Sequence, residues 1–357
     1  MRTLAILLLI ICGASPAAPA QDAGLARTLD SLRTAIGARG AGAAVIFADG
    51  RRWSGVSGEA WAGQPVTDTT LFELGSVTKT YTAALVLQLV GDRALRLDDT
   101  LGAYVTDVPG VQGATIRQLL NHTSGIPDVW QNPRLVPAIM RNPARAWTVG
   151  ETLGYLDSAA ARTPGWRYSS TGYLLLGRVI ERVTGMPLAA ALRARLLEPL
   201  RLEHTFFEAG EAVRGQKAHA FLDLNRDGTS EDLNALTPTT AFVSAAWAAG
   251  GMTATTADAA AWMRALLHGT ALDSAGRAML WTLVDRPDGN RHGLGLLVIG
   301  ADSTMLAGHL GNSTGFSAAV FHAPASGITV ALLTNAHGVH LRDPVLALLR
   351  AAERRRN

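Results

Sequence analysis

The chain has 357 residues, 48% of them hydrophobic, and a formal net charge of +3 at pH 7. This length and apolar content suit one large domain, or two lobes that share a core. Lys and Arg number 32 against 29 Asp and Glu, so the positive charge is a small excess and not a basic patch, which argues against a nucleic-acid partner.

The first twenty residues have the pattern of a secretory signal peptide. Arg2 precedes the apolar run Leu4–Cys12, and Ala18-Pro19-Ala20 gives a small-residue cleavage site. The run is too short to span a bilayer. We therefore expect residues 1–20 to be removed and residues 21–357 to form the mature domain, in the periplasm or secreted. Cleavage removes Cys12, the one cysteine, which excludes a disulfide and a catalytic thiolate.

The N-terminal part predicts a helix, a hairpin and a second helix. Apolar residues recur at helical spacing over 22–37. Two strand-like segments, 43–48 and 51–56, flank Asp49-Gly50, a two-residue hairpin signal. The next helix, over 76–90, is apolar on nearly every side, which indicates that it is buried.

The middle of the chain, from about residue 101 to 240, reads as helices and loops. Thr115–Gln118 has the pattern of a capping box that opens a helix. A helix over 171–183 stops at Gly185, and Pro187 starts the next one. A further capped helix is predicted over 255–268, after this region.

From Gly293 onward the pattern changes to short strands separated by Gly, Asp, Ser and Pro. The predicted strands are 294–299, 305–310, 315–322 and 329–334. Strands this close together pair antiparallel, and Asp343-Pro344 starts a final helix.

The economical assembly is an α+β fold. One antiparallel sheet, built from N- and C-terminal segments, is flanked by the terminal helices, and a mainly helical lobe is inserted. This predicts an α/β lobe of about 21–100 and 241–357 and a helical lobe of about 101–240. A cleft is expected where the lobes meet.

Lys79 is one of only two lysines and follows Ser76 by three residues, which places the two on one helix face. A serine hydroxyl is a weak nucleophile until a base takes its proton. A buried amine can accept that proton, whereas a guanidinium stays protonated. S-x-x-K is a short and common pattern. The pair alone therefore fits a catalytic role and an ordinary one, in which Ser76 caps the helix and Lys79 is solvated, equally well.

Two further segments supply candidate cleft residues. Tyr168 occupies a loop just before a predicted helix and is a second candidate base. His309-Leu310-Gly311-Asn312 lies at the end of a predicted strand, from which a polar side chain and a backbone N–H can face the cleft.

Together and in this order, these segments resemble the serine β-lactamase and penicillin-binding protein superfamily. The match is closest to its class C β-lactamase, esterase and D-Ala-D-Ala carboxypeptidase branch. Three other segments also match the branch: Leu119–Pro127, Gly250–Met252 and His292–Gly295. The resemblance covers nearly all of residues 21–357.

The resemblance implies a cofactor-free serine hydrolase with no metal that cleaves an ester or amide bond in a small-molecule or peptide substrate. Ser76 would be the acylated nucleophile. Lys79 and Tyr168 would share proton transfer, with the primary base left open. His309 would stand where many members have Lys, and would position substrate or tune Tyr168. A monomer is the expected state.

The resemblance also implies an oxyanion hole formed by the backbone N–H groups of Ser76 and Asn312. Two departures weaken a β-lactam preference. Ser170 stands where the family usually has Asn, and His309-Leu310-Gly311 replaces the common Lys-Thr-Gly or His-Thr-Gly. The lost hydroxyl and cation help to hold a substrate carboxylate, so esterase- or peptidase-like activity is favoured, with weak β-lactamase activity possible.

Three other segments match known motifs only in part. Gly311–Gly315 fits G-x-S-x-G, but a strand follows it and no acid-then-His order does. Asp223–Gly228 resembles the start of a calcium loop, although Asn234 occupies the position of the expected Glu. His337 and His340 lack the partners of a metal motif. The strongest non-enzymatic alternative is a catalytically inactive, penicillin-binding-like envelope protein.

Overall fold

The computed structural model describes residues 19–157, 162–223, 227–236 and 238–354. Almost all of the predicted signal segment therefore lies outside the described residues. None of the helices in the described part is long and apolar enough to span a membrane.

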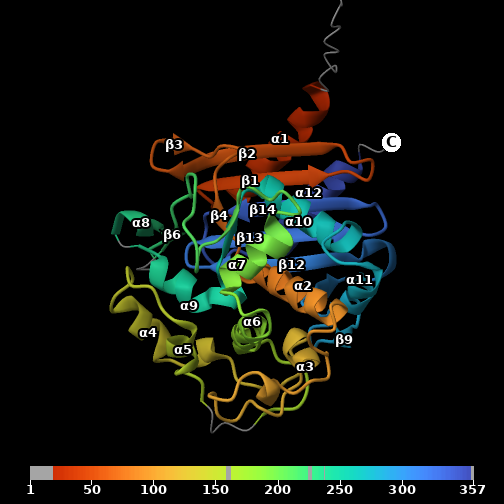
Figure 1. Cartoon of the computed structure of the whole chain (residues 1–357). Coiled ribbons are helices and arrows are strands. Elements are labelled where there is room, and N and C mark those ends of the chain that lie inside the picture. Colours follow the sequence, from red (N-terminus) through yellow and green to blue (C-terminus); the bar gives the residue numbers. More distant parts are fainter. Residues whose placement is uncertain (1–18, 158–161, 224–226, 237, 355–357) are drawn as a thin grey trace, which may run out of the picture.

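Within these residues, nine strands form one antiparallel sheet in the order β3-β2-β1-β14-β13-β12-β11-β10-β9. Its strands are β1 Gly40–Ile46, β2 Arg52–Trp61, β3 Gln64–Pro65, β9 Val284–Asp285, β10 Arg291–His292, β11 Leu297–Ile299, β12 Leu306–Ser313, β13 Phe316–Ala323 and β14 Ile328–Thr334. The first and last strands lie side by side (Figure 1), with Ala41 opposite Thr334. The predicted sheet built from both ends of the chain is confirmed.

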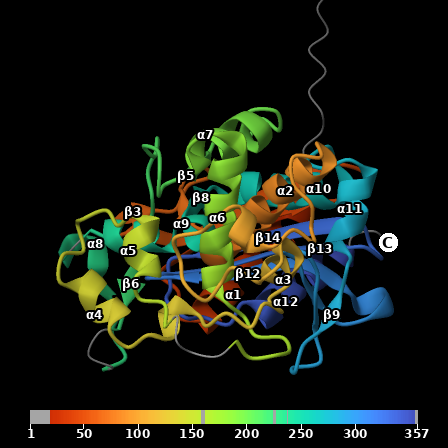
Figure 2. The same ribbon diagram turned by 60° about the horizontal axis from the view of Figure 1, so that its bottom comes forward.

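The central strands are buried on both faces, and their side chains alternate between two cores. On β1, Ala43 and Val45 join the core under the terminal helices α1 (Pro19–Ala35) and α12 (Arg342–Glu353), whereas Ala44 and Ile46 join the larger core. Helices α2 (Thr78–Gly91) and α10 (Thr256–His268) lie on the opposite side of the sheet from α1 and α12 (Figure 2).

The remaining helices are α3 Ile116–Leu120, α4 Leu135–Met140, α5 Val149–Leu153, α6 Ser170–Thr184, α7 Leu188–Leu192, α8 Leu233–Leu236, α9 Thr240–Gly250 and α11 Ser274–Leu280. Helices α3, α4, α5 and α6 lie together in the lower part of the molecule in Figure 1. Two small sheets add β4 Phe72–Glu73, β8 Met252–Ala254 and β5 Thr205–Phe207, and the pair β6 Phe221–Leu222 and β7 Glu231–Asp232. The division into two lobes at the boundaries given above stays a prediction.

Local signals in the sequence locate several helix ends. The capping box before α3 forms as predicted, because the Thr115 hydroxyl accepts the Gln118 N–H and the Gln118 side chain accepts the Thr115 N–H. Helix α6 ends at Gly185, whose φ of +67° is the left-handed conformation that glycine adopts without steric cost. Thr255 caps α10 by accepting the Asp258 N–H.

Other local predictions were wrong in detail. The first hairpin has three loop residues and not two, because Phe47 and Arg51 still pair and Gly50 closes the turn at φ +88°. Ser76 lies in a short 3-10 turn, Gly75–Val77, and α2 begins only at Thr78. The predicted strand 294–299 shortens to β11, because Gly295 turns the chain at φ +83°.

Candidate active site

The turn that carries Ser76 is pressed against strand β12. Gly75 has φ +49°, and a Cβ there would lie 2.5–2.8 Å from backbone atoms of Asn312. Real Cβ atoms do not approach backbone this closely. The positive φ and the close contact therefore both require glycine at position 75. The contact holds the Ser76 turn at the end of β12, directly before the buried helix α2.

Two side chains meet at the Ser76 hydroxyl. Tyr168 donates a hydrogen bond to Ser76 Oγ at 2.7 Å, and Lys79 Nζ donates one at 3.1 Å. Lys79 Nζ also donates to Ser170 Oγ at 3.3 Å and to the Ala249 carbonyl at 2.8 Å. The Lys79 side chain is only 1% exposed. Its three oxygen contacts occupy the hydrogen-bonding positions of Nζ, which accounts for a lone lysine in this core.

The third contact of Lys79 depends on a kink in α9. Trp247 has φ +38° and ψ −121° inside this helix, a conformation that a residue with a side chain adopts only under strain. Beyond the kink, the Ala248 carbonyl accepts Thr82 Oγ1 and the Ala249 carbonyl accepts Lys79 Nζ. Gly177 on α6 leaves the space that the Trp247 ring fills. Sequence patterns gave no signal for this backbone acceptor.

The two backbone segments of the predicted oxyanion hole lie against each other. A Cβ on Gly311 would lie 2.0 Å from the Leu74 carbonyl oxygen and 3.2 Å from Ser76 N. The Asn312 backbone meets the same turn at Gly75. The Asn312 carboxamide accepts the Ser317 hydroxyl at 2.9 Å, so its backbone is the part that faces the turn.

His309 lies behind Tyr168 and not in the cavity wall. Its ring centroid is 6.4 Å from that of Tyr168, and its Nδ1 lies 2.5 Å from the Leu310 carbonyl. Burial, and then repulsion from His292, lower the pKa of His309 to about 3. A neutral imidazole leaves His309 without the fixed charge of the lysine found in many members, and its action through Tyr168 stays a prediction.

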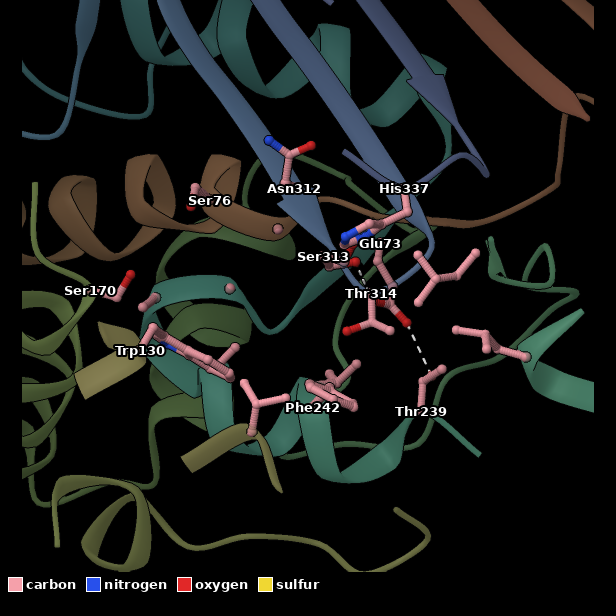
Figure 3. A pocket seen from close by; sticks show the side chains of 18 of the residues that line it. Glu73, Ser76, Trp130, Ser170, Thr239, Phe242, Asn312, Ser313, Thr314 and His337 are labelled. Carbon is pink, nitrogen blue, oxygen red and sulfur yellow. Dashed lines mark hydrogen bonds between the residues drawn. The ribbon is translucent and has the colours of Figure 1, made fainter. Parts of the chain in front are cut away.

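A cavity of about 590 Å³ opens beside Ser76. Figure 3 shows Ser76 and Ser170 at one end, Trp130 and Phe242 along a wall, and Glu73 with Thr239 and Ser313 at the other end. The Glu73 carboxylate accepts Ser313 Oγ at 2.6 Å and Thr239 Oγ1 at 3.2 Å. Sequence reasoning missed this buried acid, because its partners lie far from it in the chain.

Comparison with known proteins identifies the family. The Beta-lactamase family model matches residues 25–354. The chain belongs to the β-lactamase family.

Proteins similar to this β-lactamase family member include a penicillin-binding protein, an esterase and an amidase. Penicillin-binding protein 4 of Amycolatopsis lactamdurans is 38% identical over 54% of this chain and 51% of its own length. Esterase EstB of Burkholderia gladioli is 35% identical over 43% of this chain and 42% of its own length. The chain thus spans about half the length of these relatives. The crystal structure of D-amino acid amidase from Ochrobactrum anthropi SV3 complexed with L-phenylalanine amide superposes with a TM-score of 0.83 at 27% identity, covering 95% of this chain and all of that one.

Three buried histidines form a cluster behind Tyr168 in this family member. The His122 ring lies 4.4 Å from the Tyr168 ring and 4.7 Å from that of His292, and His292 lies 6.0 Å from His309. Their Nε2 atoms have no hydrogen-bond partner among the described residues. Burial lowers the pKa of His292 to about 3 and that of His122 well below its usual range. The sequence motifs contain His122 and His292 but did not reveal this cluster.

We expect acid to destabilise the protein through these histidines. The folded pKa values of His292 and His309 are about 3, that of His122 is also lowered, and the unfolded values are near 6.5. The unfolded chain therefore binds more protons than the folded protein over this range, so the free energy of unfolding falls as the pH falls from 6.5 toward 3. Each histidine contributes a slope of about 1.4 kcal/mol per pH unit. Urea unfolding between pH 7.5 and 4.5 measures it. His309→Asn should lower the slope by the contribution of one histidine, about 1.4 kcal/mol per pH unit. His340→Asn, at an exposed position, is the control. Equal slopes in the two variants would contradict the role of His309 in acid destabilisation.

His122 holds both neighbours of Tyr168. Its carbonyl accepts the Arg167 N–H at 2.9 Å, and its Nδ1 accepts the Ser169 N–H at 3.2 Å. Its φ of +62° is unfavourable for most residues and tolerated by Asn. The arrangement makes His122 a positioning residue for the tyrosine.

We therefore expect His122→Ala to lower kcat by at least about tenfold, since the ring contact and the Ser169 bond are both lost. His122→Asn keeps an acceptor near the Nδ1 position and tolerates the backbone, so it should recover most of that loss. Ester turnover and thermal melting of both variants measure the effect. Wild-type kcat in His122→Ala would show that the His122 side chain has no role in positioning Tyr168.

A metal site finds no support at the other candidate positions. Residues 224–226 of the calcium-like loop lie outside the described residues, and the Asp223 carboxylate accepts the N–H groups of Asp227 and Gly228. Among the described residues, no group of three or more His, Cys, Asp or Glu side chains is arranged to hold a metal ion. The Gly311–Gly315 segment runs from β12 directly into β13, which excludes a nucleophile elbow.

Proposed function

We propose that this family member is an active serine hydrolase that forms a covalent acyl-enzyme on Ser76 and cleaves ester or amide bonds. The observation that supports it best is the meeting of Tyr168 OH and Lys79 Nζ at Ser76 Oγ, 2.7 and 3.1 Å away, beside an open cavity. An inactive binding protein has no need for this arrangement.

In the proposed reaction, Ser76 Oγ attacks the carbonyl carbon and a C–O bond to the enzyme forms. The hydroxyl proton passes to Lys79 Nζ as a neutral amine, or to Tyr168 as a phenolate, and the backbone N–H groups of Ser76 and Asn312 stabilise the oxyanion. The same proton then goes to the leaving oxygen or nitrogen as its bond to the carbonyl carbon breaks. Water, deprotonated by the same groups, releases the acid and restores Ser76.

Among substrates, we place small esters and D-amino acid derivatives first, peptidoglycan stem peptides second and β-lactams third. The structural similarity to a D-amino acid amidase supports the first place. Among the described residues that line the cavity, Lys79 is the only Lys or Arg, which leaves no free cation for the carboxylate of a β-lactam. Export to the periplasm or the medium is part of the proposal and is supported by the signal-like pattern of residues 1–20.

A side-by-side assay tests the proposal. Wild-type protein is given p-nitrophenyl acetate, a D-amino acid amide, a D-Ala-D-Ala peptide and a chromogenic cephalosporin, and steady-state rates are compared. We expect kcat/KM to be highest for the ester or the amide. A large preference for the cephalosporin would overturn the ranking. Labelling by a fluorophosphonate without turnover of any substrate would favour the inactive binding protein.

A further inference from the structure

The cavity beside Ser76 is lined mainly by apolar side chains. Its wall includes residues from four separate segments: Trp130, Met140, Leu222, Phe242, Val243 and Ala246. A volume of about 590 Å³ is far larger than the acetyl group of a minimal ester requires, and falls within the range of pockets that enclose whole small molecules.

The mouth of this cavity is also apolar. Val136 and Met140 on α4 line the cavity and are still 41% and 48% exposed. These two are among the few large hydrophobic side chains that the described residues expose. Apolar side chains gathered around an opening mark a binding surface.

The charged groups at the cavity disfavour an anionic ligand. The Nζ of Lys79 is already hydrogen-bonded to Ser76, Ser170 and Ala249. At the far end, Glu73 is 2% exposed and is held by Lys217 at 3.0 Å as well as by Thr239 and Ser313. A ligand carboxylate placed there would meet a carboxylate with no free cation to offset it.

We propose that this cavity binds the acyl group of the substrate, and that this group is extended, apolar and free of negative charge. The inference rests on the proposed acyl-enzyme, because the acyl group is the part that stays attached to Ser76 after the leaving group departs. Burial of the acyl group therefore contributes binding energy both while the acyl-enzyme forms and while it is hydrolysed. Each methylene that becomes buried is worth about a fourfold gain in binding.

A series of p-nitrophenyl esters with one leaving group tests the inference. From acetate through butyrate to octanoate, kcat/KM should rise by at least tenfold. The p-nitrophenyl monoester of octanedioic acid has the same chain with a terminal carboxylate, and its kcat/KM should be at least tenfold below that of octanoate. A flat or falling series, or equal rates for the two eight-carbon esters, would overturn the inference while acetate turnover still supports the hydrolase.

A matched pair of variants locates the acyl group. Met140→Glu, at the mouth, should lower the octanoate-to-acetate ratio by at least fivefold, whereas Met186→Glu, at an exposed methionine that does not line the cavity, should leave it unchanged. Calorimetric binding of octanamide and acetamide gives a readout that needs no turnover. Tighter binding of octanamide, lost in Met140→Glu, supports the inference even if no ester is hydrolysed. Equal binding of the two amides, or equal effects of the two variants, overturns it.

Discussion

Replacing Ser76 with alanine is expected to lower kcat/KM for p-nitrophenyl acetate by roughly 10⁴-fold or more and to abolish labelling by a fluorophosphonate. Both effects have one cause: Ser76 Oγ is the atom on which the Tyr168 and Lys79 hydrogen bonds converge. Ser170 Oγ also contacts Lys79, at 3.3 Å, but its bonds include none to Tyr168, so it lacks the second proton-transfer partner.

The Ser76→Ala fold should be intact, because the turn is held by Gly75 against β12 and not by the hydroxyl. A thermal midpoint close to that of the wild type would show this. Ser57→Ala is the matched control: it removes a hydroxyl on β2 that bonds Asp30 and Arg33 of α1, none of which lines the cavity, and should leave activity unchanged. Activity of Ser76→Ala within tenfold of the wild type would mean that another residue is the nucleophile.

The elements that sequence predicted best are those whose causes are local. A three-residue spacing in helical backbone brings Ser76 and Lys79 to one face, even though Ser76 lies in the 3-10 turn that leads into α2. Capping residues such as Thr115, and Gly185 after α6, likewise act within a few residues of themselves. The sequence also predicted the sheet, from closely spaced strands at the C-terminal end and a hairpin signal near the N-terminus. These two sets of strands bury their apolar faces most simply by pairing in one sheet.

The features that sequence did not reveal depend on contacts between distant segments. The Ala249 carbonyl reaches Lys79 only because α9 is kinked at Trp247. Glu73 lines the cavity because Lys217, Thr239 and Ser313 hold its carboxylate there. The nearest of the three in sequence, Lys217, is 144 residues away. No spacing rule connects such residues, since their proximity is a result of tertiary packing.

The size and apolarity of the cavity were likewise hidden in the sequence. Trp130, Leu222, Phe242 and Asn312 come from a 3-10 turn, a short strand, a helix and the end of β12. Each residue is unremarkable in its own segment, and only their convergence gives a binding site. The departures at Ser170 and His309-Leu310-Gly311 did point in the same direction, because they removed groups suited to a carboxylate.

Lys79→Arg is expected to lower kcat by at least about a hundredfold, the scale usual for losing a general base. The guanidinium keeps the positive charge but does not release its proton near neutral pH, so it cannot exchange one with Ser76. The larger group also has to fit a site where Lys79 is 1% exposed. Lys79→Met, which keeps an unbranched chain without the charge, therefore serves as a second variant, with circular dichroism to check folding.

The chain offers a control of the same chemical type in its other lysine. Lys217 bonds Glu73 and Glu208, and these carboxylates raise its pKa despite burial, so it acts as a fixed cation. Lys217→Arg preserves that charge and should keep kcat within a few-fold of the wild type. If Lys79→Arg also stays near the wild type while Tyr168→Phe loses activity, Lys79 is electrostatic and Tyr168 is the base. If both Lys79 variants fold and fail while Lys217→Arg works, proton transfer by the amine is what Ser76 requires.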